Sequence, residues 1–399
     1  MSSWAPLLAF LLGLLLSIAE GNHYEGHWLG QPCLPGQPCV LAFISNNPVV
    51  LRCPRSSYRG HITWQYLDPS WTDEQPLTFL RSRGTSWPLF SHDKLQRLRF
   101  KSRLIAGTGS LYISSPTRED SGLYTCRAGD ATLAYYEVDF QDAERLHVSH
   151  TELGEANLGN VTVLLDQGAQ ATLFTSWSPW QSCNRCGHPG ERKQVGFCYA
   201  QLTTMDSEEE MPMPCGMARQ KYSTLPQRGP ELRIETCQVR CETSYLAGQE
   251  EPHWVPFLVF TNYHPQLKAT AHLRCPASSI YSPVYWQVGL TMLTHLQLLQ
   301  KNFNVSRSSQ SLDKATGGGI LHLSFQNDSH STFYQCFVNR RLAGKFLVTS
   351  PGAVSPPGEL AHTYSIIEAL VVGLSIFLVF LMFLSIIESC RRKPEITVV

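Results

Sequence analysis

The sequence predicts an all-β protein in which two β-sandwiches flank a small disulfide-rich module and one transmembrane helix follows. Apolar residues around Cys53 and Cys126 alternate with polar ones, as they do in strands. The stretch L-R-C-P-R-S-S from Leu51 recurs as L-R-C-P-A-S-S from Leu273, which indicates a repeated domain. Of the 13 cysteines, 12 lie between two terminal apolar segments, an even number that suits disulfides in an oxidising compartment.

The first apolar segment runs from Ala5 to Ala19 and ends in small residues, Ser17 and Ala19, at the two positions that signal peptidase reads. We therefore expect residues 1–19 to be a signal peptide. A membrane anchor is the alternative, and the shortness of the segment and the polar residues directly after it weigh against it.

The second apolar segment, residues 369–387, has 19 uncharged residues. As a helix it is about 28 Å long, close to the hydrocarbon thickness of a bilayer. Arg391, Arg392 and Lys393 follow it, so the positive-inside rule places the carboxyl terminus in the cytosol. We expect a single-pass plasma-membrane protein with an extracellular amino terminus, a stalk at 351–368 and a cytoplasmic tail at 388–399.

The first sandwich is marked by alternating apolar positions at Val49 and Leu51, at Trp64 and Tyr66, and at Leu111 and Ile113. Together with Cys53, Trp64 and D-S-G-L-Y-T-C from Asp120, this resembles a variable-type domain of the immunoglobulin superfamily, at 20–150. The resemblance implies a Cys53–Cys126 disulfide packed on Trp64 and a tyrosine corner at Tyr124. It also implies a strand D near Arg99, with Arg99 paired to Asp120.

The second sandwich is expected at 250–350, since Cys275, Trp286 and Cys336 repeat the first pattern. The resemblance implies a Cys275–Cys336 disulfide. Their interval of 61 residues is shorter than the 73 between Cys53 and Cys126, which suits fewer strands and leaves the subtype of the domain open. Upstream of the first domain, Cys33 and Cys39 are close enough to close a small loop by their own disulfide.

A cysteine-rich module is expected at 177–241, after a linker at 151–176. W-S-P-W-Q-S-C from Trp177, G-E-R from Gly190 and six cysteines resemble a thrombospondin type 1 repeat. The resemblance implies a cation–π ladder of Trp177, Trp180, Arg192 and Arg233, and the pairs Cys183–Cys237, Cys186–Cys241 and Cys198–Cys215. A zinc knuckle or redox pair at C-x-x-C is the alternative, but neither the second pair of ligands nor the thioredoxin-like setting that it needs is visible.

The whole order of segments resembles poorly characterised families of immunoglobulin-like single-pass membrane proteins that are defined by sequence similarity. The sequence has no H-E-x-x-H, no phosphate-binding glycine loop after a strand and no G-x-S-x-G, so we expect neither an enzyme nor a cofactor or metal. A formal net charge of zero gives no global field for nucleic acid.

Two features point to the first domain as the binding surface. The sequons at Asn160, Asn304 and Asn327 predict glycans, and two of the three lie in the second sandwich, where sugars exclude partners. The first domain carries a basic stripe in which Leu98 and Phe100 are expected to face inward and the charges outward. These charges are candidates for contact with an anionic partner such as a sulfated glycan or an acidic surface, and a solvated edge is the alternative. They are Arg97, Arg99, Lys101 and Arg103.

The leading hypothesis for function is cell-surface recognition or adhesion, in which the first domain binds another surface or matrix protein and the remaining modules act as a rigid spacer. A signalling receptor and a shed soluble ectodomain are the alternatives. On the inner side, Thr397 and the terminal Val399 match a ligand for a cytosolic PDZ scaffold.

Overall fold

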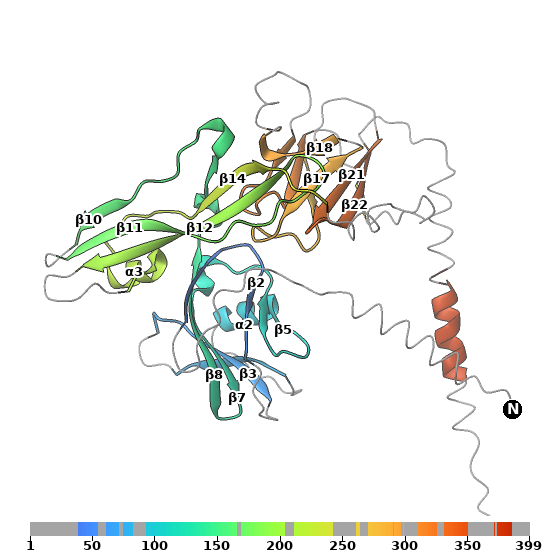
Figure 1. Ribbon diagram of the computed structural model, residues 1–399. Coiled ribbons are helices and arrows are strands. Elements are labelled where there is room, and N and C mark those ends of the chain that lie inside the picture. The colour runs from blue at the N-terminus through green and yellow to red at the C-terminus, as the bar shows by residue number, and fades with distance from the viewer. Residues whose placement is uncertain are drawn as a thin grey trace, which may run out of the picture.

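The computed structural model describes residues 39–54, 61–71, 75–82, 93–165, 169–203, 211–241, 261–263, 270–289, 291–296, 298, 310–324, 331–349, 371 and 373–384. Two β-sandwiches and a long, narrow sheet between them in sequence make up almost all of it (Figure 1). We call them the first domain, the second domain and the middle module.

The first domain is a sandwich of five strands on three. Strand β1 runs parallel to β8, and the other pairs are antiparallel. The larger sheet has the order β1 (Cys39–Ile44), β8 (Ala131–Gln141), β7 (Gly122–Ala128), β3 (Ile62–Leu67) and β4 (Leu77–Arg81). The smaller sheet has the order β2 (Val49–Leu51), β6 (Leu111–Ile113) and β5 (Ser102–Leu104).

The core of the first domain has the arrangement that its sequence pattern predicts. The Cys53–Cys126 disulfide joins the two sheets, and Trp64 is fully buried. The Tyr124 hydroxyl donates to the carbonyl of Asp120 at 2.5 Å, which forms the expected tyrosine corner. The Trp64 indole donates to the carbonyl of Gly109 at 2.9 Å, so the polar atom of this buried ring is satisfied.

A helix, α2 (Asp93–Lys101), stands where the sequence predicts strand D, and that prediction is wrong. Leu95 and Leu98 are buried three residues apart on one face of the helix, while Phe100 is 81% exposed instead of facing inward. The run L-R-F-K fits either period over so few residues, but Asp93 in the first turn and Lys101 in the last complement the helix dipole. Strand β5 starts only after this helix.

The expected ion pair between Arg99 and Asp120 is also corrected. Lys101 Nζ lies 3.1 Å from Asp120 Oδ2. The same oxygen accepts from the backbone amide of Thr117 at 2.7 Å and from its hydroxyl at 2.9 Å. Because the helix turns its side chains by about 100° per residue, the last residue, Lys101, reaches the carboxylate, whereas Arg99, two residues earlier in the same turn, points about 200° away.

The second domain repeats the strand order of the first, five strands on three, so the shorter cysteine interval does not reduce the number of strands. The Cys275–Cys336 disulfide and the buried Trp286 occupy the equivalent positions. One sheet consists of β15 (Thr261–Tyr263), β22 (Arg341–Thr349), β21 (Ser331–Val338), β17 (Val284–Val288) and β18 (Thr291–Leu293). The other consists of β16 (Thr270–Arg274), β20 (Ile320–Ser324) and β19 (Gln310–Leu312).

The middle module is built on one six-stranded sheet with a short helix, α3 (Cys215–Lys221), at one end. Its strands are β10 (Val161–Leu164), β11 (Gln170–Trp177), β12 (Gly190–Thr203), β14 (Glu231–Cys237) and β9 (His147–His150), with β13 (Met213–Pro214) paired to β12. Short 3-10 turns lie at η1 (Arg118–Asp120), η2 (Ala143–Arg145) and η3 (Thr151–Leu153). The predicted linker at 151–176 is therefore wrong for the most part, since β10 and most of β11 fall within it.

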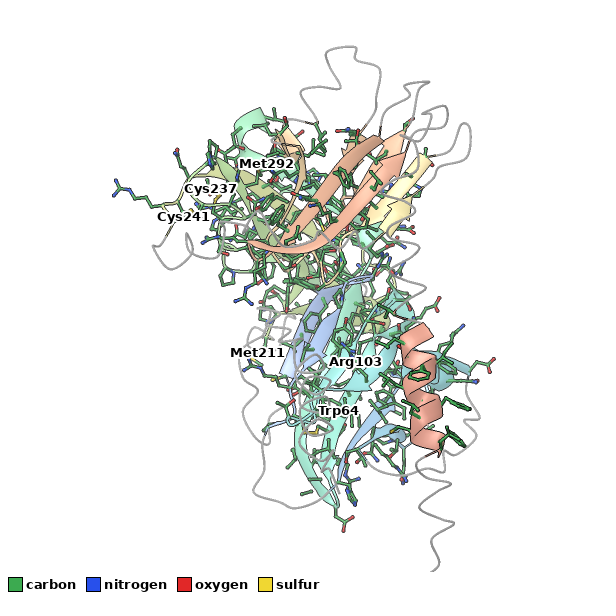
Figure 2. All side chains as sticks on the ribbon, turned by 90° about the vertical axis from the view of Figure 1, so that its right-hand side faces the viewer. Trp64, Arg103, Met211, Cys237, Cys241 and Met292 are labelled. Atoms are coloured by element: carbon green, nitrogen blue, oxygen red, sulfur yellow. A yellow bond between two sulfur atoms is a disulfide. The ribbon has the colours of Figure 1, made fainter. Side chains whose placement is uncertain are left out.

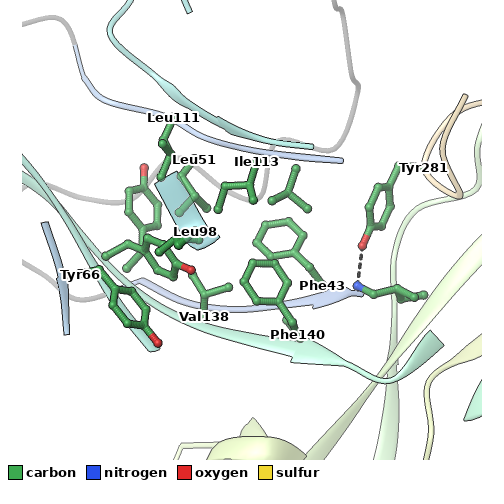
Figure 3. Packing of buried hydrophobic residues seen from close by; sticks show 14 of the residues in the cluster. Phe43, Leu51, Tyr66, Leu98, Leu111, Ile113, Val138, Phe140 and Tyr281 are labelled. Atoms are coloured by element: carbon green, nitrogen blue, oxygen red, sulfur yellow. Dashed lines mark hydrogen bonds between the residues drawn. The ribbon is translucent and has the colours of Figure 1, made fainter. Parts of the chain in front are cut away.

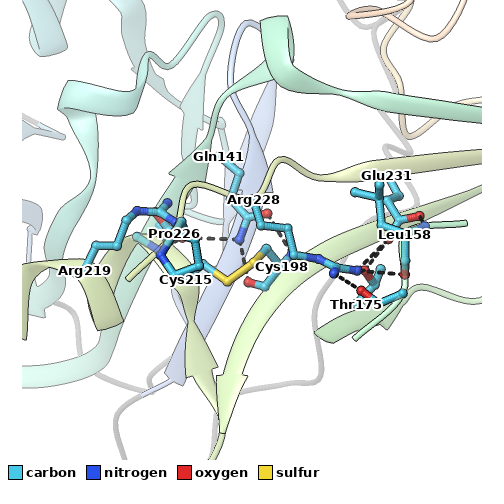
Figure 4. Close-up of a disulfide and its surroundings, with 12 residues drawn as sticks. Gln141, Leu158, Thr175, Cys198, Cys215, Arg219, Pro226, Arg228 and Glu231 are labelled. Atoms are coloured by element: carbon cyan, nitrogen blue, oxygen red, sulfur yellow. Dashed lines mark hydrogen bonds and ion pairs between the residues drawn. A yellow bond between two sulfur atoms is a disulfide. The ribbon is translucent and has the colours of Figure 1, made fainter. Parts of the chain in front are cut away.

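Contacts around Arg228 show why this segment belongs to the sheet (Figure 4). Arg228 forms a buried ion pair with Glu231 at 3.1 Å, and both side chains are almost inaccessible to solvent. Arg228 donates to the carbonyl of Leu158 at 3.0 Å, and Glu231 accepts from the amide of Leu158 at 2.8 Å. Both the carbonyl and the amide of Leu158 are thus hydrogen-bonded to the middle module, although the sequence predicts that this residue lies in a linker before it.

The middle module contains the disulfides that the resemblance implies, Cys183–Cys237, Cys186–Cys241 and Cys198–Cys215. Figure 2 labels Cys237 and Cys241, and Figure 4 shows the Cys198–Cys215 disulfide at its centre. With Cys183 and Cys186 both in disulfides, the zinc-knuckle alternative is ruled out. Arg192 lies 4.9 Å from the centre of the Trp180 ring and Arg233 lies 4.7 Å from that of Trp177, so the expected cation–π stacking is present.

Several predicted segments lie outside the described residues: the signal peptide at 1–19, Cys33, Asn304, Asn327, the stalk at 351–368 and the tail with Thr397 and Val399. Cys39 is in a disulfide. Within the segment predicted to span the membrane, residues 371 and 373–384 are described and helical. No helix among the described residues is both long and apolar enough to cross a bilayer.

Candidate recognition surfaces

The four residues of the predicted basic stripe are divided between two elements and have different surroundings. Arg97 and Arg99 lie on α2, and Arg97 is exposed. Lys101 is engaged with Asp120. Arg103 lies on β5, with its guanidinium carbon 4.5 Å from the centre of the Tyr112 ring. The four charged side chains therefore do not form a single stripe, because Lys101 forms an ion pair with Asp120 inside the fold.

Helix α2 is anchored to the sandwich below it. Its Leu95 and Leu98 belong to the core, and Lys94 forms an ion pair with Asp68. Burial alone raises the pKa of Asp68, but the hydrogen bonds from Lys94 and Ser70 outweigh burial and hold this pKa below its ordinary value. The helix thus has a fixed orientation, with Phe100 facing solvent.

Phe100 is the residue that the sequence interpretation misplaced. An aromatic side chain 81% exposed is unusual, and Arg97, three residues earlier, lies on the same outer side of the helix. The signal that could have located it is the spacing of Leu95 and Leu98 behind Asp93, which is typical of a helix. We call Arg97, Arg99, Phe100 and Arg103 the α2 face.

The first and second domains are in direct contact. Ile280 and Tyr281 of the second domain belong to the hydrophobic core of the first (Figure 3). The backbone amide of Ile44 donates to the Tyr281 hydroxyl at 2.6 Å, and the Tyr281 ring packs edge-on against Phe43 with the ring centres 6.3 Å apart. The two domains therefore share a buried apolar surface.

Asn47 completes this contact. Its side chain has no exposed surface. It accepts a hydrogen bond from the amide of Ile280 at 2.8 Å and donates to the carbonyl of Ala315, also at 2.8 Å. One buried amide therefore fixes two segments of the second domain against the turn between β1 and β2.

The middle module contacts the second domain through buried charges. Glu191 accepts hydrogen bonds from the His295 amide at 3.1 Å, the His295 imidazole at 3.0 Å and the Leu296 amide at 3.1 Å. Lys193 Nζ donates to the carbonyl of Gly317 at 2.7 Å. Burial lowers the pKa of Lys193 to about 7, and the nearby Glu191 opposes this only in part.

The middle module also contacts the first domain. Both ends of the Gln141 amide bond the backbone of Cys198, at 2.8 and 2.9 Å. Asp139 accepts from the amide of Gly216 at 2.9 Å, and burial raises the pKa of this carboxyl. The hydrophobic core of the first domain includes Val195 and Phe197 as well.

These contacts occupy one end of the second domain. The turn between β16 and β17, residues 276–283, is its B–C turn and packs on the first domain through Ile280 and Tyr281. The turn between β21 and β22, at Asn339 and Arg340, is its F–G turn, and Arg340 Nε donates to the carbonyl of Cys183 in the middle module at 3.2 Å. In variable-type domains the corresponding loops form the binding end. In the first domain the F–G turn at Gly129 is exposed.

Among the described residues, no group of three or more His, Cys, Asp or Glu side chains could hold a metal ion. His272 and His322 form a cross-strand pair on the second domain, with Nδ1 atoms 2.6 Å apart; His272 is exposed and His322 partly so.

No family model matches the chain. Among curated proteins, it is 26% identical over 317 residues to the Ig-like V-type domain-containing protein FAM187A of Bos taurus, covering 74% of this chain and 71% of that protein. The Rattus norvegicus protein of the same name is 26% identical over 322 residues, covering 74% and 72%. These relatives are named for a V-type domain, in agreement with the strand order of both sandwiches.

Solved structures similar to parts of the chain are immunoglobulin domains. The first Ig-like domain of human CD48 antigen is 20% identical and covers 29% of this chain and 87% of its own, with a TM-score of 0.21. The CD2-binding domain of CD58 is 10% identical and covers 43% and 100%, with a TM-score of 0.23.

Proposed function

We propose that this chain is a non-enzymatic cell-surface recognition or adhesion protein whose first domain binds another surface or matrix protein through the α2 face. In this proposal the chain enters the secretory pathway through residues 1–19 and is anchored by residues 369–387, with its amino terminus outside the cell. The five disulfides between described cysteines support an oxidising compartment.

The observation that carries the proposal is the exposure of Phe100 on a helix whose other face is fixed. Aromatic and arginine side chains dominate the energetics of protein interfaces, since they bury a large area at a small cost in conformational entropy. Arg97 precedes Phe100 by three residues on the same helix and Arg99 is its direct neighbour, while the buried Leu95 and Leu98 hold the opposite side of the helix on the core. A preformed aromatic anchor with a basic rim suits a partner that offers an apolar pocket edged by acids.

The other two modules have a supporting role in this proposal. The sequence suggested a spacer of successive modules, but the second domain packs directly against the first through Asn47 and Tyr281. The binding end of the second domain is occupied by internal contacts. The modules therefore form one support that presents the first domain in a fixed orientation.

The test uses cells that display the full chain, with proximity labelling of neighbouring surface proteins. We expect Phe100→Ala to lose the specific neighbours, because removal of an aromatic anchor costs about 2 kcal/mol or more, roughly a 30-fold loss of affinity. Leu164→Ala is the matched control, since Leu164 is 82% exposed on the middle module. Identical sets of neighbours for the Phe100 variant and the unchanged chain, at equal surface amounts, would refute binding through this face.

A further inference from the structure

A cleft of about 760 Å³ separates the first and second domains beside their direct contact. One wall is the outer surface of the small sheet of the first domain, with Val50, Tyr112 and Ser114. The other is formed by residues 274–279, 281 and 282 and by the F–G turn of the second domain, residues 338–343. We call it the interdomain cleft, and it is separate from the outer side of α2 that carries Phe100.

The cleft is basic. Arg274, Arg340 and Arg341 line it, and no Asp or Glu is among the described residues that do so. Arg274 and Arg341 are exposed, and neither forms an ion pair with a described residue. Arg274 and Arg341 thus bring two exposed guanidinium groups to a cleft whose described lining has no acid, and Arg340 adds a third positive charge, so the site attracts anions.

An aromatic ring and a further arginine extend the site along the first domain. In the small sheet, Tyr112 lies directly between Val50 on β2 and Arg103 on β5. Tyr112 lines the cleft, and Arg103 lies over its ring at 4.5 Å (Figure 2 labels Arg103). The basic surface therefore continues from the cleft onto the rim, as a long rather than compact ligand would require.

The backbone of the cleft is unusual. Four non-glycine residues among those described have a positive φ, and all four line this cleft: Asn46 at 61°, Ala277 at 56°, Asn339 at 50° and Arg340 at 65°. Asparagine adopts this conformation readily, but alanine and arginine do so at a cost of about 1–2 kcal/mol. Asn339 and Arg340 are the two central residues of the hairpin between β21 and β22, where the turn requires a positive φ at both, and this turn brings the charge of Arg340 to the cleft.

We propose that the interdomain cleft binds a sulfated glycan. Guanidinium groups pair with sulfate and carboxylate groups in a bidentate way, and a tyrosine ring with nearby serine and asparagine side chains suits the faces and hydroxyls of sugar rings. Disulfide-stabilised domains belong to oxidising compartments, where sulfated glycans are an abundant polyanion. An acidic peptide satisfies the charge of the arginines but not the hydrogen-bonding groups around Tyr112.

The test measures binding of a fluorescent heparin octasaccharide to the full chain in detergent. We expect the double variant Arg274→Ser with Arg341→Ser to bind about tenfold or more weakly, since each lost charge-assisted contact costs roughly 1 kcal/mol. The control is Arg81→Ser with Arg240→Ser, which removes the same charge from exposed positions outside the cleft and should change the affinity less than twofold. Arg274→Lys with Arg341→Lys should recover only part of the binding, because lysine lacks the bidentate geometry.

Two further probes define the ligand. The chemically desulfated octasaccharide should bind at least tenfold more weakly than the sulfated one, and an octapeptide of glutamate should not compete at equal charge. The proposal is overturned if the cleft variant and the control weaken binding equally, if sulfation makes no difference, or if the peptide competes as well as the glycan. Equal melting temperatures of all variants show that the comparison concerns binding.

Discussion

Asn47 satisfies both of its buried polar atoms, and two of its three partners are far away in sequence. Its carbonyl oxygen accepts from Ile280, and its amide nitrogen donates to the carbonyls of Ser45 and Ala315. A buried asparagine with three hydrogen bonds specifies one relative arrangement of the groups that contact it, since no other arrangement satisfies all of them. Asn47 is therefore a residue through which domain orientation is defined.

We expect Asn47→Ala to lower the free energy of unfolding by about 1–3 kcal/mol, because the Ile280 amide and the Ala315 carbonyl lose their partner in a buried place. Denaturant unfolding of the full chain measures this. The control is Gln96→Ala, which removes an exposed amide from α2 and should change stability by less than about 0.5 kcal/mol. Equal effects of the two substitutions would contradict the role given to Asn47.

The buried Lys193 makes the stability of the fold depend on pH. Its pKa is lowered to about 7 in the fold, whereas the unfolded chain keeps the ordinary value of 10.5. Below pH 7 both states are protonated and the buried charge destabilises the fold in full. Between pH 7 and 10.5 the unfolded state binds more protons, so the destabilising contribution diminishes as the pH rises.

Lys193→Met should therefore gain stability relative to the unchanged chain most strongly at or below pH 7. The gain should shrink toward pH 9 by up to about 1.4 kcal/mol per pH unit, on top of a constant loss of the hydrogen bond to Gly317. Denaturant unfolding at pH 6, 7, 8 and 9 measures the difference. The exposed Lys314→Met serves as control and should show no such trend. A difference that does not change with pH for Lys193→Met would mean that this lysine stays charged in the fold.

Strands and helices could be predicted from the sequence where a short, local pattern of residues marks them. The buried cysteines, tryptophans and tyrosine of each sandwich follow from period-two alternation and a short spacing, so most core strands of the first domain could be predicted. Helix α2 could not, because L-R-F-K fits a strand as well as a helix and only the burial of Leu95 decides between them. Strands β9 and β10 could not either. Strand β9 has one apolar residue and pairs with β14, more than 80 residues away, and β10 has only four residues, which are mostly exposed.

Helix α2 can be tested by two neighbouring side chains. In a strand, Leu98 and Phe100 share a face, whereas in the helix Leu98 is fully buried and Phe100 is exposed. We expect Leu98→Ala to cost about 2–5 kcal/mol of stability and Phe100→Ala to change it by less than about 0.5 kcal/mol. Thermal and denaturant unfolding of the full chain measure both. Comparable losses for the two variants would restore the strand and remove the basis of the α2 face.

The interdomain cleft is formed by two domains together, and the sequence alone does not predict it. Neither Tyr281 nor Arg274 stands out in the sequence, and the cleft exists only because the second domain docks on the first. Such docking depends on the shapes of two surfaces, and no local pattern encodes those. The basic stripe is visible in the sequence as a concentration of charge, but only the fold shows that Lys101 is paired with Asp120 and that Arg103 borders the cleft.

Asn160 is exposed directly before β10 and tests the proposed passage of the chain through the secretory pathway. If the chain passes through the secretory pathway as proposed, this sequon should carry a glycan, since its backbone and side chain are accessible. Asn160→Gln should then reduce the apparent mass of the protein from mammalian cells by one glycan, with no difference left after enzymatic deglycosylation. Unchanged mobility of this variant would exclude modification at Asn160.

The docked turns of the second domain have a consequence for how the molecule can change over evolution. Surface turns ordinarily accept substitutions and insertions with little penalty. The turns at 276–283 and at Asn339 instead touch the first domain or the middle module, so a change there must suit two surfaces at once. The F–G turn of the first domain meets no such requirement. Substitutions that preserve the fold should therefore be fewer in the docked turns of the second domain than in the F–G turn of the first.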